Sequence, residues 1–93
     1  MPHFKLAHIR EQGQNMLLFP LDGAIHHKTD AQKSGILGEL EMRSHAAGLA
    51  GSAAILWECG GRMHFMGPRP WRAFLQSISM LWVMRNLNRE ISW

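Results

Sequence analysis

Basic and aromatic residues gather in the stretch RMHFMGPRPWRAF, which spans residues 62–74. An arginine side chain binds phosphates and carboxylates with paired hydrogen bonds and also stacks on flat rings. Residues 62–93 contain five arginines and one acidic residue, whereas residues 1–61 contain five lysines and arginines against six acidic residues. The positive charge is therefore concentrated in the C-terminal third. This asymmetry is compatible with an acidic partner, and a solvated surface that happens to contain arginines is the alternative.

The segment 80–91 is expected to be a helix with one apolar face, because its apolar residues recur at helical spacing. Trp82, Arg85, Asn86 and Arg89 would then lie together beside that face. Arginine and asparagine make bidentate contacts with guanine and adenine edges, and tryptophan stacks on unpaired bases. A purely structural explanation is also open, in which Trp82 forms an intramolecular cation–π contact with Arg85.

Two earlier segments contribute further candidates for partner binding. Arg69 and Arg72 lie near the start of an expected helix, where free backbone N–H groups favour a phosphate. Trp57, Arg62 and His64 share one face of an expected hairpin, similar in kind to a base-stacking platform. The candidate partner-binding residues are therefore Trp57, Arg62, His64, Arg69, Trp71, Arg72, Trp82, Arg85, Asn86 and Arg89. For Trp71 the alternative is a position in the core.

Histidines and the lone cysteine are the potential metal ligands of the chain. The candidates are His26, His27, His45, Cys59 and His64. Structural zinc sites use two pairs of ligands two to four residues apart, and this chain has only the adjacent pair 26–27. The sequence therefore predicts no metal site.

Motifs of the common catalytic sites are not found in the sequence. It contains no P-loop, no GxGxxG, no GxSxG and no HExxH. Cys59 and His64 could form a thiolate pair, but no third group is evident to orient the histidine. We therefore expect no enzymatic activity, no cofactor and no small-molecule substrate.

The first half of the chain predicts a hairpin followed by a helix. The strand-like runs 3–10 and 15–21 are separated by EQGQ, which suits a β-turn, and Pro20 should end the second strand or place it at an edge. Residues 22–28 are expected to be loop. Thr29 followed by Gln32 forms a capping box, and Gly48 suits a helix end, so a helix is predicted over 30–47.

A second hairpin is predicted around the sequence CGG. The runs 52–58 and 62–67 flank it, and a two-residue turn at 60–61 places Cys59 opposite Arg62 and Trp57 opposite His64. Beyond this hairpin, residues 70–78 and the segment that begins after Ser79 are expected to be helical. Whether they form two helices or one kinked helix is open.

The order of elements, β-β-α-β-β-α-α, predicts an α+β fold. Two β-hairpins would form a four-stranded antiparallel sheet, with the helices packed on one face. No linker or low-complexity segment interrupts the chain, so residues 1–93 are expected to form a single domain.

Composition narrows the classes of function. Seven methionines and four tryptophans among 93 residues exceed the needs of a small core, which indicates apolar surface for a partner. One cysteine cannot form an internal disulfide, and no segment resembles a leader or a membrane span, so we expect a cytoplasmic protein with no membrane contact. The sequence favours a small intracellular, non-enzymatic module that binds protein, as a homodimer or an accessory subunit. The alternative is nucleic-acid binding through the basic, aromatic C-terminal third.

Overall fold

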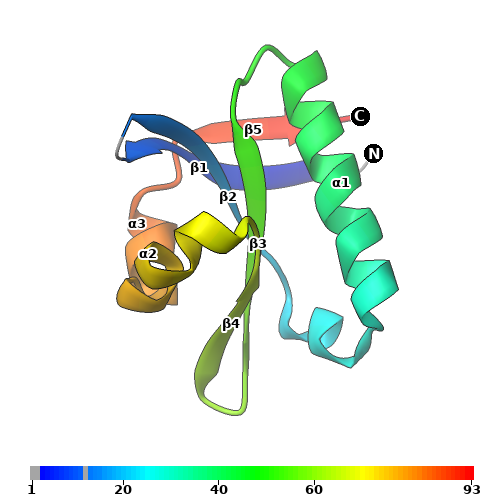
Figure 1. Cartoon of the computed structure of the whole chain (residues 1–93). Coiled ribbons are helices and arrows are strands. Elements are labelled where there is room, and N and C mark those ends of the chain that lie inside the picture. Colours follow the sequence, from blue (N-terminus) through cyan, green and yellow to red (C-terminus); the bar gives the residue numbers. More distant parts are fainter. Residues whose placement is uncertain (1–2, 12) are drawn as a thin grey trace.

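The computed structural model describes residues 3–11 and 13–93, which form a compact α+β domain around a five-stranded sheet (Figure 1). In the described residues no helix has the length and apolar character that crossing a membrane requires. The elements are, in order, β1 (His3–Glu11), β2 (Gln14–Pro20), the 3₁₀ helix η1 (Gly23–His27), α1 (Asp30–Ala46), β3 (Ser52–Cys59), β4 (Arg62–Met66), the 3₁₀ helix η2 (Arg69–Trp71), α2 (Arg72–Ser77), α3 (Met80–Arg85) and β5 (Arg89–Ser92).

The sheet is mixed, so the predicted four-stranded antiparallel sheet is wrong. Its strand order is β4-β3-β2-β1-β5, in which β2 and β3 run parallel and the other neighbouring pairs are antiparallel. Parallel neighbours need a long crossover connection, and η1 and α1 provide it between β2 and β3. The two predicted hairpins therefore associate through β2 and β3, and both of these strands lie inside the sheet.

The C-terminal segment forms the fifth strand, which the sequence did not predict. The helix expected over 80–91 ends at Arg85, and β5 pairs antiparallel with β1. Asn88 fixes the change of direction, because its side chain accepts a hydrogen bond from the His8 N–H at 2.8 Å and donates one to the His8 carbonyl at 2.9 Å. Pairing with β1 satisfies backbone groups that would otherwise lie open at the sheet edge.

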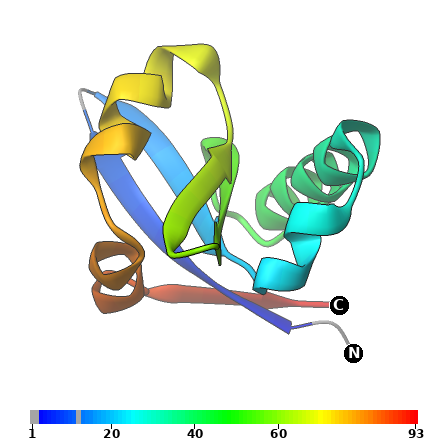
Figure 2. The same cartoon turned by 90° about the horizontal axis from the view of Figure 1, so that it is seen from below.

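Helices cover both faces of the sheet, and this corrects the expectation that they pack on one (Figures 1 and 2). On one face α1 packs over a core that includes Phe19 and Leu40. On the other face α2 and α3 pack over a second core that includes Leu56, Leu75 and Val83. The inner strands β2 and β3 contribute side chains to both cores, since consecutive residues of a strand point to opposite faces.

The predicted helix 30–47 is confirmed apart from its last residue, as α1 ends at 46. Thr29 Oγ1 accepts from the Gln32 N–H at 3.1 Å, and Gln32 Oε1 accepts from the Thr29 N–H at 3.0 Å, which completes the capping box. At the other end Gly48 has a φ of 87° and the Leu49 N–H donates to the Ser44 carbonyl at 2.9 Å. This positive φ and this hydrogen bond are features of a Schellman motif.

Both predicted hairpins are confirmed. In the second, Gly60 and Gly61 have φ values of 64° and 77°, which is the pattern of a type I′ turn. Trp57 lies opposite His64, in the predicted register. In the first hairpin β2 ends at Pro20, as expected of a residue that lacks a backbone N–H.

Candidate functional site

A groove of about 730 Å³ lies along the outer edge of β4, and we term it the β4 groove. Because β4 is an edge strand, residues from both faces of the sheet border this groove. His26 of η1 and the first turn of α1 lie on one side, and η2 and α2 lie on the other. Its lining includes four cationic side chains and one carboxylate, namely Lys33, Arg62, Arg69, Arg72 and Asp30. Such a surplus of positive charge attracts acidic groups.

Rings packed around Trp57 form the α1 side of the β4 groove. Trp57 is only 4% exposed, and its Nε1 donates to His26 Nδ1 at 3.1 Å. His64 stacks on Trp57 with ring centroids 5.9 Å apart, and the Lys33 Nζ lies 5.0 Å from the centre of the tryptophan ring. The aromatic surface of this side is therefore engaged in contacts within the chain.

His26 is neutral in this cluster. Its Nδ1 accepts the hydrogen bond from Trp57, so in the neutral ring the proton is on Nε2. Desolvation lowers the pKa of His26 below the ordinary value of 6.5, and the nearby charges of His64, Lys33 and His27 lower that pKa further. His26 therefore adds no positive charge to the cationic side chains of the groove, which are Lys33, Arg62, Arg69 and Arg72.

Trp71 anchors the opposite side of the β4 groove. It is 4% exposed, lies in the core under α2 and donates from Nε1 to Gln14 Oε1 at 2.7 Å. This bond ties η2 to the start of β2. Arg69 and Arg72, on either side of Trp71 in the chain, are exposed and line the groove. Of the two explanations for Trp71, the structure places it in the core.

The structure brings together five of the ten predicted partner-binding residues. Those that line the β4 groove are Trp57, Arg62, His64, Arg69 and Arg72. All five come from β3, β4 and the segment that directly follows β4. Lys33 and His26 also line the groove, but they were not among the predicted partner-binding residues. They come from a distant segment, and His26 was considered only as a metal ligand.

The remaining candidates do not join this group. Trp82 packs edge-on against Phe74, with ring centroids 6.0 Å apart, and Asn86 donates from its side chain to the Trp82 carbonyl at 2.7 Å. Arg85 is the last residue of α3 and Arg89 is the first of β5. The expected convergence of Trp82, Arg85 and Arg89 on one helix is therefore wrong, because α3 ends before Arg89.

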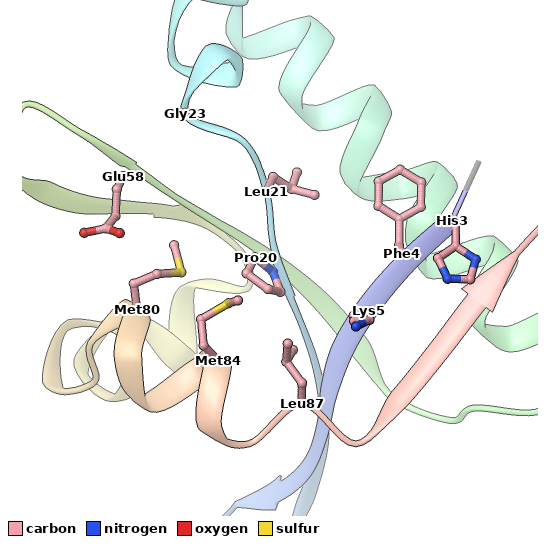
Figure 3. A pocket seen from close by; sticks show the side chains of 10 residues that line it. All are labelled: His3, Phe4, Lys5, Pro20, Leu21, Gly23, Glu58, Met80, Met84 and Leu87. Atoms are coloured by element: carbon pink, nitrogen blue, oxygen red, sulfur yellow. The ribbon is translucent and has the colours of Figure 1, made fainter. Parts of the chain in front are cut away.

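A second hollow, of about 440 Å³, lies between α3 and the ends of β1 and β2. Figure 3 shows Met80, Met84 and Leu87 facing Pro20 and Leu21 across it. We term it the methionine hollow; its other lining residues are His3, Phe4, Lys5, Gly23 and Glu58. The sequence predicted one apolar face for the helix expected over 80–91, which includes Met80, Met84 and Leu87, but it did not predict the hollow. The signal that pointed to it was the surplus of methionine.

Within residues 3–11 and 13–93, no three histidine, cysteine or acidic side chains are arranged to hold a metal ion. Comparison of the chain with protein-family models, with curated proteins and with solved structures gives no match.

Proposed function

We propose that this chain is a small non-enzymatic binding module that acts through protein–protein contacts, as a homodimer joined at the methionine hollow. The observation that supports the proposal is the exposure of large apolar side chains on α3, the helix that borders that hollow. Met84 lines it and is 52% exposed, and Leu81, on the same short helix, is 61% exposed. Methionine adapts its shape to a partner surface, and clustered exposed apolar side chains are typical of protein interfaces.

A second copy is the proposed occupant because the apolar rim of the hollow can pack against the same rim of another copy. In a two-fold symmetric contact each copy presents the same surface, so apolar side chains meet apolar side chains. Lys5 and Glu58 lie on either side of Pro20 in the hollow (Figure 3). In such a dimer Lys5 of one copy lies within reach of Glu58 of the other, which adds charge complementarity at the rim.

Light scattering coupled to size-exclusion chromatography tests the proposal. We expect the wild type to be dimeric at high micromolar concentration. Met84→Lys should raise the dimer dissociation constant by at least about tenfold, because it buries an unpaired ammonium group in the interface. Met42→Lys is the matched control, since Met42 is 58% exposed but lies on α1, on the other face of the sheet.

Two results would contradict the homodimer. One is a wild type that stays monomeric at high micromolar concentration. The other is a Met42→Lys variant that weakens association as much as Met84→Lys does. A monomeric wild type would leave the accessory-subunit form of the hypothesis, in which a different protein occupies the hollow.

Nucleic-acid binding is the second candidate, and the cationic side chains of the β4 groove are the observation that favours it. Three of the five predicted arginines line that groove. The tryptophans expected to stack on bases are instead packed within the chain, as described above for Trp57, Trp71 and Trp82. Without these tryptophan rings, single-strand binding loses the stacking contribution that was expected from them. Protein binding is therefore placed first.

A further inference from the structure

We infer that the β4 groove is a docking site for an extended acidic peptide, which pairs with the outer edge of β4 and extends the sheet by one strand. This inference goes beyond the proposed dimer, because the β4 groove and the methionine hollow share no lining residue. Three features support it: the backbone groups at the edge of β4, the charge of the groove and the state of its aromatic rings.

The outer edge of β4 offers backbone groups for pairing. In an antiparallel ladder closed by a two-residue turn, Arg62 forms the first hydrogen-bonded pair with β3, and the pairs then alternate. His64 and Met66 are therefore bonded to β3, whereas Met63 and Phe65 direct their N–H and C=O groups outward. An added strand satisfies these groups, as in other complexes formed by strand addition.

Cationic side chains lie on both sides of the place where the added strand would run. Lys33 comes from α1 on one side, and Arg69 and Arg72 come from η2 and α2 on the other. Consecutive side chains of a strand point to opposite faces of the sheet, so alternate side chains of the added peptide would face Arg69 and Arg72. Acidic residues at alternate positions of the peptide are therefore favoured.

The arginines of the groove are free to bind a partner, whereas Lys33 is only 9% exposed and lies over the Trp57 ring. Among the described residues, the one close contact between a basic side chain and a carboxylate joins His3 Nε2 and Glu90 Oε1 at 2.8 Å and lies outside the groove. The groove arginines thus have no carboxylate partner in this part of the chain. An arginine–carboxylate pair is a strong, directional contact, so a peptide with glutamate or aspartate side chains fits this site.

An acidic peptide fits the groove better than either alternative occupant, a nucleic acid or a second copy of the chain. A nucleic acid would find phosphate-binding cations but not the tryptophan ring expected to stack on bases, because Trp57 is covered by His64 and Lys33. A second copy paired through β4 would bring the arginines of both copies together, and like charges repel. An acidic peptide uses both the cations and the open strand edge.

Fluorescence anisotropy with defined peptides tests the site. The probe is a fluorescein-labelled, end-blocked hexapeptide of alternating glutamate and valine. We expect saturable binding that weakens as salt is added, because the contacts are ionic. The same peptide with lysine in place of glutamate should not bind. A version with an N-methyl group on every residue should bind at least about tenfold more weakly, because it keeps the charge but has no backbone N–H to donate to a strand edge.

Matched variants separate the site from general attraction to a basic protein. Arg69→Gln combined with Arg72→Gln should weaken binding of the acidic hexapeptide by at least about tenfold. Arg10→Gln combined with Arg85→Gln removes the same charge from exposed positions outside the groove, and should leave the affinity nearly unchanged. Thermal unfolding is the control for folding: both double variants should have nearly the wild-type Tm, since exposed arginines contribute little to stability.

Amide hydrogen exchange locates the contact. With bound peptide, the N–H groups of Met63 and Phe65 should become protected, whereas those of His64 and Met66 should change little because β3 already binds them. The inference is wrong if the N-methylated peptide binds as tightly as the parent, if the two double variants lose affinity equally, or if no peptide binds. It is also wrong if an oligothymidylate binds tighter than the peptide, since the groove would then be a nucleic-acid site.

Discussion

Replacing Gly51 by alanine should destabilise the fold strongly, because this glycine lies where β3 enters its parallel pairing with β2. Gly51 has a φ of 127°, a conformation that residues with a Cβ rarely adopt. A Cβ at this position would lie 2.5 Å from the carbonyl oxygen and 2.9 Å from the Cβ of Asn15. Asn15 belongs to β2, so it cannot move away without displacing that strand.

The expected loss of stability follows from these two contributions. The unfavourable φ costs about 1–2 kcal/mol, and displacing packed backbone adds about 1–3 kcal/mol. We therefore expect Gly51→Ala to lower the free energy of unfolding by about 3 kcal/mol, which for a domain of this size corresponds to a fall in Tm of roughly 15 °C. Gly48→Ala is the control: its φ is 87°, but nothing lies within 4 Å of the added Cβ. It should cost about 1 kcal/mol, or roughly 5 °C in Tm.

Urea and thermal denaturation followed by circular dichroism measure the difference. The close contact with Asn15 is expected to make Gly51→Ala clearly worse than Gly48→Ala. Equal losses for the two variants would refute the reasoning, because both have a positive φ and only Gly51 has the contact.

Two further predictions concern the β4 hairpin and the ring cluster. Gly60→Val should lower the free energy of unfolding by about 1–2 kcal/mol, because a β-branched residue is strained at a φ of 64° although the space is open; an unchanged urea midpoint would contradict it. Lowering the pH through 6.5 should reduce the free energy of unfolding. The unfolded chain takes up a proton at His26 in this range, whereas the folded chain does so only at lower pH, because its His26 pKa is lowered. In an NMR titration, His64→Gln should move the pKa of His26 upward, and a wild-type pKa at or above 6.5 would contradict this account.

Local features of the fold were predictable from sequence because the interactions that form them are local. The capping box of Thr29 and Gln32 and the turn at 60–61 each depend on residues within a few positions of one another. The turn also fixed the register of β3 and β4, since a two-residue loop leaves one pairing. The formation of these features does not depend on contacts with distant parts of the chain.

The association of the two hairpins was not predictable from such local features, since nothing in a hairpin specifies which edge of it pairs next. One signal was present in the runs MLLF (16–19) and AAILW (53–57), where apolar residues are continuous rather than alternating. Continuous apolar runs are typical of strands buried on both faces, and both runs are fully buried here. They indicated helices on both faces of the sheet. The segment 89–92 gave no comparable signal, because four residues fit a helix or a strand equally well.

The candidate site was predictable only where its residues are close in sequence. Arg62, His64, Arg69 and Arg72 lie within eleven positions, and the turn that follows β4 brings them to one groove. Lys33 joins them because α1 crosses from β2 to β3 and its first turn reaches the edge of β4. That placement depends on the parallel pairing, which the sequence did not indicate.

The pairing of β1 with β5 also constrains how the chain reaches its folded state. His3 lies opposite Ser92, so closing this ladder joins segments nearly the whole length of the chain apart. Long loops close at a greater entropic cost than short ones, and contacts of high sequence separation slow folding. We expect the two hairpins to form first and β5 to add late. Because the paired ends are adjacent, a circular permutant can link them and open the chain at 60–61. Such a permutant would keep every strand pairing and lose only the turn between β3 and β4. In that permutant the β1–β5 pair becomes local, and the order in which the strands assemble would be reversed.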